Sequence, residues 1–102
     1  MQTHITARHT TLTDSLRGHI EHSVNKLDRY YNGIHDAHVV LNGDAGVSKT
    51  AEVKLNVYRR TLTAQNDAPT YQEAVSGCVR QLRRQVLRYK DTMRSTDKDV
   101  HR

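Results

Sequence analysis

Two histidines have the residue type and spacing that come nearest to catalytic or metal-binding chemistry in this sequence. His19 and His22 are three residues apart in a segment with helical periodicity, so both imidazoles would lie on one helix face. Such a pair could hold a metal ion or act as a general base in RNA cleavage. No carboxylate is suitably placed to complete a metal site, and no partner for acid–base chemistry is visible. We therefore predict no catalytic residue, no metal and no cofactor, and we expect that the protein is not an enzyme.

The segment GDAGVSKT, Gly43 to Thr50, is close to a phosphate-binding loop in its spelling but not in its context. Ser48 stands where the second glycine of that loop is required. A phosphate-binding loop must also lead into a helix whose N-terminal amides hold the phosphate, whereas a segment with period-two alternation follows here. The pattern therefore indicates a turn between two strands, and we expect no small-molecule substrate.

Cys78 is the single cysteine, which excludes an internal disulfide and suits a reducing compartment. It falls on the apolar face of a predicted helix, so we expect a buried structural thiol. The N-terminal residues contain no apolar signal-peptide core, and the longest purely apolar run is Val39 to Leu41. We therefore expect a cytoplasmic protein with no membrane partner.

The strongest chemical signal is a row of cations near the C-terminus. The segment VRQLRRQVLRYK, Val79 to Lys90, holds five arginines and lysines, and apolar residues recur between them at helical intervals. Projected at about 100° per residue from Val75, the apolar positions cluster within about 60° of zero and the cations fall between about 60° and 220°. The stripe consists of Arg80, Arg83, Arg84, Arg88, Lys90 and Arg94. From Tyr71 to Arg94 only Glu73 and Asp91 oppose these six cations, so this helix carries a net charge of +4 out of +5 for the chain.

Basic residues also share one flank of the first predicted helix, which is neutral overall. His19, His22, Lys26 and Arg29 follow one another at steps of three, four and three residues, and the acidic residues lie toward the other side. If the two helices lie side by side on a sheet, both basic flanks face the same groove. This remains a hypothesis about packing, because the order of helices on a sheet is not visible in a sequence.

A basic helix face has two interpretations, and the sequence favours the second. Most charged helix faces are simply solvated and keep a protein soluble. Here like charges repel along one stripe, with few acidic residues one turn away to relieve them, and arginine pairs bidentately with phosphate. A polyanion would relieve this repulsion by replacing counterions. The chain has no Phe or Trp, so recognition of phosphates and shape is favoured over base stacking on a sheet.

Periodicity predicts the elements that position these residues. Helical spacing predicts a helix from about Thr13 to Tyr31, with Thr13 or Thr11 as N-cap, and a second helix from Tyr71 to about Met93. Period-two alternation and turn residues predict the strands, which cover residues 2–8, 37–42, 49–58 and 59–66.

The order is therefore β-α-β-β-β-α in one domain. Three adjacent strands with short links imply an antiparallel meander, and two amphipathic helices would cover its apolar face. We predict an α+β fold, a two-layer sandwich in which two helices pack on one face of a four-stranded sheet. We expect this domain to span residues 1–94 and residues 95–102, which have no apolar pattern, to form a flexible tail.

Several segments together resemble the ribosome hibernation promoting factor family, which includes the ribosome-associated inhibitor A. They are MQTHIT, LTDSLRGHIEHSVNKLDRYY, AHVVL and AVSGCVRQLRRQVLRYKD, in this order and with matching lengths. The resemblance covers residues 1 to about 94. It implies the β-α-β-β-β-α fold, which is similar to that of double-stranded-RNA-binding domains.

The resemblance also implies a function and a set of contact residues. Members bind the small ribosomal subunit and its rRNA over the messenger and transfer RNA sites and block translation in stressed or stationary-phase cells. The basic helix positions of the family fall on Lys26, Arg84, Arg88 and Lys90, whereas other members often carry acidic or neutral residues at Arg80 and Arg83. Gln81 replaces a frequent lysine. Because the resemblance covers residues 1 to about 94, the chain is similar either to short members or to the N-terminal domain of long ones.

We accordingly expect a ribosome-binding hibernation factor that inhibits translation, with a second hibernation factor as a further candidate partner. Two alternatives stay open: a general double-stranded-RNA-binding module, and a protein-interaction module that modulates transcription. The residues expected to contact RNA are Lys26, Arg29, Arg80, Arg83, Arg84, Arg88 and Lys90.

Overall fold

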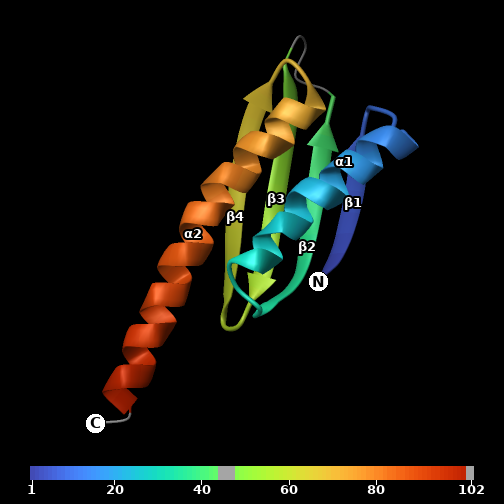
Figure 1. The fold of residues 1–102 in the computed structure, drawn as a ribbon. Helices are drawn as coiled ribbons and strands as arrows, with labels where there is room; N and C mark the ends of the chain where they lie inside the picture. The colour runs from blue at the N-terminus through green and yellow to red at the C-terminus, as the bar shows by residue number, and fades with distance from the viewer. Residues whose placement is uncertain (44–47, 101–102) are drawn as a thin grey trace.

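The computed structural model describes the backbone of residues 1–43 and 48–100 and the side chains of residues 1–43 and 48–92. The predicted order of elements is confirmed (Figure 1). The elements are β1 (Gln2–Arg8), α1 (Asp14–Asn25), the 3₁₀ helix η1 (Lys26–Arg29), β2 (Ile34–Asn42), β3 (Lys49–Val57), β4 (Arg60–Ala68) and α2 (Tyr71–Val100). The turn predicted after Gly43 falls mostly on residues 44–47, outside the described residues.

The sheet has the order β1-β2-β3-β4. The strands β2, β3 and β4 form the predicted antiparallel meander, and β1 pairs in parallel with β2. This parallel pairing follows from the α1 crossover, because a helix between two strands returns the chain to the edge from which it left. Figure 1 shows α1 and α2 side by side on one face of the sheet, with α1 toward β1 and α2 over β3 and β4, so the predicted two-layer α+β architecture is confirmed.

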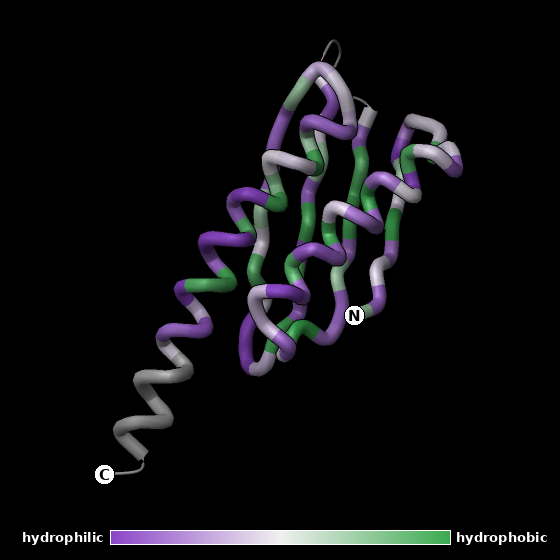
Figure 2. The backbone as a smooth tube through the Cα atoms, in the orientation of Figure 1, coloured by the Kyte–Doolittle hydropathy of each residue, from purple (hydrophilic) through white to green (hydrophobic). Residues whose placement is uncertain are grey.

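The apolar stripe of each helix meets the apolar side of the sheet, as the alternation of hydrophobic residues along the strands in Figure 2 illustrates. The largest fully buried side chains of the described residues come from both layers. They include Ile20, Leu27, Leu41, Leu55 and Leu82. Because this core fixes which side of each helix faces inward, it also fixes which side faces solvent.

Threonines begin both helices. The Thr13 hydroxyl accepts a hydrogen bond from the Leu16 amide at 3.1 Å, so Thr13 is the N-cap of α1. The Thr70 hydroxyl, directly after Pro69, accepts a hydrogen bond from the Glu73 amide at 3.2 Å and caps the start of α2 in the same manner. Each cap satisfies an amide that would otherwise lack a partner.

Both helix ends differ from the prediction. The first helix was expected to be α-helical to Tyr31, but it ends at Asn25 and continues as η1 to Arg29. Tighter winding over η1 is compatible with the same apolar spacing, so periodicity could not separate the two helix types. The second helix was expected to end near Met93 and to be followed by a flexible tail.

The backbone of α2 instead continues to Val100. The predicted helix end near Met93 is wrong because the prediction used the loss of apolar periodicity as an end signal, whereas the flexibility of residues 95–102 stays a prediction. Figure 1 shows that α2 runs past the end of the sheet, where a helix has no apolar surface to bury. No Gly or Pro interrupts it after Gly77. In the described part of the chain, no helix is long and apolar enough to cross a membrane.

Two glutamines attach α2 to the edge strand β4. Gln85 Nε2 donates to the Thr63 carbonyl at 2.9 Å, and Gln81 Nε2 donates to the Gln65 carbonyl at 3.4 Å. These contacts occupy carbonyls of the sheet edge and fix the rotation of α2 about its axis. The arginines between and beside the glutamines therefore point away from the sheet.

Candidate nucleic-acid interface

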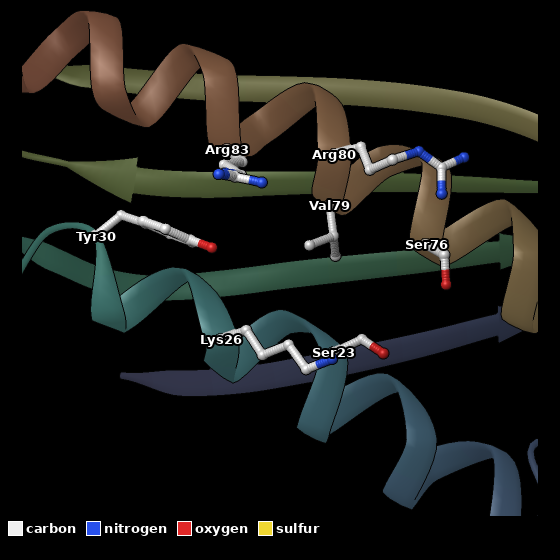
Figure 3. A pocket seen from close by; sticks show the side chains of 7 residues that line it. All are labelled: Ser23, Lys26, Tyr30, Ser76, Val79, Arg80 and Arg83. Atoms are coloured by element: carbon white, nitrogen blue, oxygen red, sulfur yellow. The ribbon is translucent and has the colours of Figure 1, made fainter.

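A groove of about 270 Å³ lies between the first helical segment and α2 (Figure 3). Its lining combines three cations, three hydroxyl groups and one valine. The segment α1–η1 contributes Ser23, Lys26 and Tyr30, and α2 contributes Ser76, Val79, Arg80 and Arg83. The groove therefore offers positive charge, hydrogen-bonding groups and apolar surface in one place.

Helical spacing explains why these side chains meet. Ser23, Lys26 and Tyr30 follow one another at steps of three and four residues, so they share the face of α1–η1 that turns toward α2. Val24 and Leu27, which adjoin them in sequence, point into the core and are fully buried. On α2, the residues that pack into the core likewise determine which side of the helix faces outward, and this places Arg80 and Arg83 at the rim of the groove.

The Arg83 guanidinium lies over the ring of Tyr30. The distance from Arg83 Cζ to the ring centroid is 5.2 Å, within the range of a cation–π contact. Tyr30 is half-buried against the core, whereas Arg83 is exposed. An aromatic ring, and not an acidic side chain, therefore positions this cation.

The other predicted cations surround the groove. Arg80 and Arg83 also line a second hollow, together with Arg84 and Leu87. Arg29 and Lys90 line a third hollow beside Tyr30. The seven predicted contact residues thus lie on the helical layer. Six of them line three adjacent hollows, and Arg88 is exposed one turn after Arg84.

None of the ion pairs among the described residues involves these seven cations. The Met1 ammonium lies 3.8 Å from Asp28, on the side of α1–η1 that faces β1. The remaining pairs, His38 with Asp36 and Lys54 with Glu52, lie on the sheet. The seven cations therefore have no ion-pair partner among the residues that the structure describes.

The hypothesis of a shared groove is confirmed as a matter of geometry, because Lys26 of the first helical segment and Arg80 and Arg83 of α2 line one cleft. Contact of these residues with RNA stays a prediction. Arg94, which the helical projection added to the stripe, has its side chain outside the described residues.

A family model described as Sigma 54 modulation protein / S30EA ribosomal protein matches residues 3–94. The chain belongs to this family. The resemblance drawn from the sequence segments is therefore confirmed.

Curated members of the S30EA family share about a quarter of their residues with this chain. The ribosome hibernation promoting factor of Escherichia coli K12 is 28% identical over 94 residues, which cover 92% of this chain and 98% of that protein. The ribosome hibernation promotion factor of Lactococcus lactis is 26% identical, and the match covers 87% of this chain but 49% of that protein. The S30EA match thus spans whole short relatives and about half of long ones.

Solved structures show the same S30EA architecture. The N-terminal domain of Protein Y from Thermus thermophilus superimposes with a TM-score of 0.79 at 27% identity, covering 87% of this chain and 99% of that domain. A ribosomal subunit interface protein from Coxiella burnetii reaches a TM-score of 0.82 at 18% identity, covering 89% of this chain and 99% of that one. The second comparison supports the fold alone.

Sequence reasoning missed the neutral residues of the groove. Ser23 and Tyr30 lie three residues before and four residues after Lys26, so the same helical spacing could have identified them. Tyr31, not Tyr30, was placed on the apolar face. In the structure the Tyr31 ring meets the Tyr89 ring edge to face, with centroids 5.5 Å apart, and this contact joins the segment after η1 to α2.

The histidines show no metal-binding arrangement. His19 and His22 are exposed on α1, and no group of three or more histidine, cysteine or carboxylate side chains in the described part of the chain could hold a metal ion. His4 and His38 pair on the open face of the sheet, where their rings stack with centroids 4.9 Å apart.

Cys78 is the buried structural thiol that the sequence predicts. Its Sγ donates to the Ala51 carbonyl at 3.3 Å and lies 3.7 Å from the Ala64 carbonyl, so it joins α2 to the middle of the sheet. Burial, with a smaller contribution from Glu52, raises the pKa of the Cys78 thiol to about 11. A thiol with this pKa stays protonated and unreactive near neutral pH.

Proposed function

We propose that this protein is a ribosome hibernation factor that binds rRNA of the small ribosomal subunit through its helical layer. Residues 1–94 form the binding domain, and the seven cations around the inter-helix groove contact phosphates. Bound there, the protein occupies the messenger and transfer RNA channel and inhibits translation in stressed or stationary-phase cells. It acts in the cytoplasm, by occupancy and without catalysis.

The observation that carries this proposal is the set of unpaired cations on one layer of the fold. Six of the seven arginines and lysines line three adjacent hollows, Arg88 lies one turn after Arg84, and none of the seven has an acidic partner among the described residues. Phosphates would relieve their repulsion and release condensed counterions. The names of the curated relatives from Escherichia coli and Lactococcus lactis support the ribosome as the source of these phosphates.

Charge reversal on the helical layer tests the proposal. Arg84→Glu with Arg88→Glu replaces two proposed phosphate contacts with repulsive groups, and we expect loss of co-sedimentation with purified small subunits at low salt. The matched control, Arg8→Glu with Lys54→Glu, makes the same charge change on the open face of the sheet. We expect the control to sediment like the wild type. Unchanged sedimentation of the first variant would show that these arginines do not bind the subunit.

A general double-stranded-RNA-binding module is the second candidate, since phosphate contacts alone would not distinguish rRNA from other duplexes. Affinity for a naked RNA duplex, measured beside affinity for intact small subunits, separates the two. Equal affinities favour the general module, whereas a strong preference for the subunit favours hibernation. A cell-free translation assay then reports whether the bound protein inhibits.

A further inference from the structure

The groove in Figure 3 has features that a phosphate does not use. Phosphate oxygens require cations and hydrogen-bond donors, which Lys26, Arg80 and Arg83 supply at the rim. The Val79 side chain and the Tyr30 ring also line the groove, and Figure 3 shows both projecting into the space between the helices. Apolar and aromatic surface favours a flat, uncharged group.

Arg83 and Tyr30 together form a platform for such a group. The guanidinium lies 5.2 Å from the ring centroid and is held by no acidic side chain among the described residues. Unstacked RNA bases stack on aromatic rings and on the planes of arginine guanidinium groups. The contact of the two side chains therefore presents preformed stacking surface at the groove.

Hydroxyl groups at the groove are also available to a ligand. Ser23 is 7% exposed and is the one buried polar residue that the described residues contain. No hydrogen bond joins the side-chain hydroxyls of Ser23, Ser76 or Tyr30 to other groups of the described residues, although all three line the groove. A hydroxyl both donates and accepts, so each can pair with the edge of a base.

We propose that the groove binds one unstacked nucleobase of a single-stranded RNA segment, packed against Tyr30 and Arg83. Ser23 and Ser76 hydrogen-bond to the edge of the base, and Lys26 and Arg80 bind the phosphates next to it. This inference rests on the proposed function, because it names the part of the RNA that enters the site. It differs from that proposal at one residue, since Arg83 stacks on the base while the other six cations contact phosphates.

The dimensions of the site favour an RNA strand over a free nucleotide. The groove volume of about 270 Å³ lies just below the range of small-molecule pockets, which begins at about 300 Å³, so it has room for little more than one base. Further cations line the two hollows that share residues with the groove, Arg84 in one hollow and Arg29 and Lys90 in the other. Flanking phosphates of a strand would use them, whereas a mononucleotide would not reach them.

A fluorescent base tests this inference directly. The probe is a short single-stranded oligoribonucleotide that carries one 2-aminopurine, whose fluorescence falls when it stacks. We expect the wild-type protein to bind and quench it. Tyr30→Leu removes the ring, and Arg83→Lys keeps the charge but removes the plane. Each should weaken binding by about fivefold or more, as expected for the loss of one stacked base, and abolish the quenching.

Matched variants separate stacking from charge and from folding. Tyr30→Phe keeps the ring and should keep the quenching, and Arg8→Lys makes the Arg→Lys change on the open face of the sheet and should behave like the wild type. If Tyr30→Leu does not fold, as circular dichroism would show, the exposed Arg83→Lys variant decides. Quenching that persists in Arg83→Lys at unchanged affinity would overturn the inference.

The ligand is checked with two further probes. An abasic version of the oligoribonucleotide keeps the phosphates but has no base at the 2-aminopurine position, and we expect it to bind more weakly and to be insensitive to Tyr30→Leu. Equal binding of both oligonucleotides would overturn the inference. In a competition assay, the unlabelled strand should displace the probe at a much lower concentration than adenosine monophosphate does. Displacement by both competitors at the same concentration would overturn the assignment to an RNA strand.

The two proposals fail in different assays. If the wild-type protein does not sediment with small subunits, the proposed function is wrong whatever the oligonucleotide shows. If the wild type sediments with small subunits but binds the abasic and complete oligonucleotides equally, the base site alone is wrong.

Discussion

The helical layer and the open face of the sheet are both polar, but their polar side chains differ in how many partners they have within the protein. On the open face, the Asn56 side chain donates through Nδ2 to Asp36 and accepts through Oδ1 from the Thr61 hydroxyl. The Thr50 hydroxyl donates to Asp67 at 2.9 Å. These residues satisfy one another across neighbouring strands. On the helical layer seven cations have no acidic partner among the described residues.

This difference separates a solvated surface from a binding surface. A polar group whose bonds are already made gains little from a ligand, because the ligand must replace an existing partner. A cation crowded by like charges gains from any anion that approaches it. The distribution of pairing, and not the number of polar residues, therefore identifies the side that needs a partner.

The largest expected effect is on the salt dependence of binding. If six of the seven cations contact phosphates, affinity for small subunits should fall by about 10³-fold or more between about 50 mM and 200 mM salt. Replacing each contacting cation with glutamine should flatten the slope of log affinity against log salt concentration by about 0.7 to 0.9. Titrations at several salt concentrations measure both quantities.

The open face supplies the control for that experiment. Gln in place of Arg8 or Lys54 should leave the slope unchanged. A slope that responds equally to changes on both faces would remove the distinction between them.

A second, smaller effect is expected on the pH dependence of stability, through the Cys78 thiol that joins α2 to the sheet. Burial raises the pKa of Cys78 from 9.0 in an exposed thiol to about 11, so folding favours the protonated thiol. This stabilisation is fully present below about pH 9 and is lost as pH rises toward 11, by about 2 to 3 kcal/mol in total. Denaturant unfolding of the wild type from pH 8 to 11 should show the decline.

The comparison with Cys78→Ala isolates the thiol. The variant removes the titrating group but keeps Tyr89, whose phenol pKa burial also raises. We expect the variant to lose less stability over the same pH range. Identical pH profiles for the two proteins would show that the thiol does not titrate in this way.

The smallest expected effect comes from breaking the hydrogen-bond ladder of the open face. Asn56→Ala leaves Asp36 and Thr61 without their shared partner, and we expect a loss of about 0.5 to 1.5 kcal/mol in the free energy of unfolding. Sedimentation with small subunits should not change, because the ladder lies on the side away from the groove. Weaker sedimentation of the folded variant would place the open face in the binding surface.

Much of this architecture could be predicted from local patterns. The apolar residues Ile20, Val24 and Leu82 recur at helical intervals and are buried, and the strands from β2 to β4 follow period-two alternation. The stripe from Arg80 to Lys90 could also be predicted, because the apolar positions of a helix determine by subtraction which residues face outward.

The errors occur where local patterns have no information. The 3₁₀ helix at Lys26–Arg29 keeps the same apolar periodicity as an α-helix. The continuation of α2 to Val100 lies beyond the last residues that show this periodicity. The groove residues Ser23, Tyr30 and Ser76 were missed for another reason. Serine and tyrosine occur in many settings, so their residue types did not point to a site, although Ser23 and Tyr30 stand at helical spacing from Lys26.

By itself, the sequence determined the element order, the buried face of each helix and the concentration of charge on the second helix, because each of these depends on residues a few positions apart. Only the tertiary structure decided that Lys26 and Arg83 share a groove and that Arg83 lies on Tyr30. These residues are more than fifty positions apart, and their meeting depends on where two helices settle on a common sheet. That position results from the packing of the whole core, which no local pattern contains.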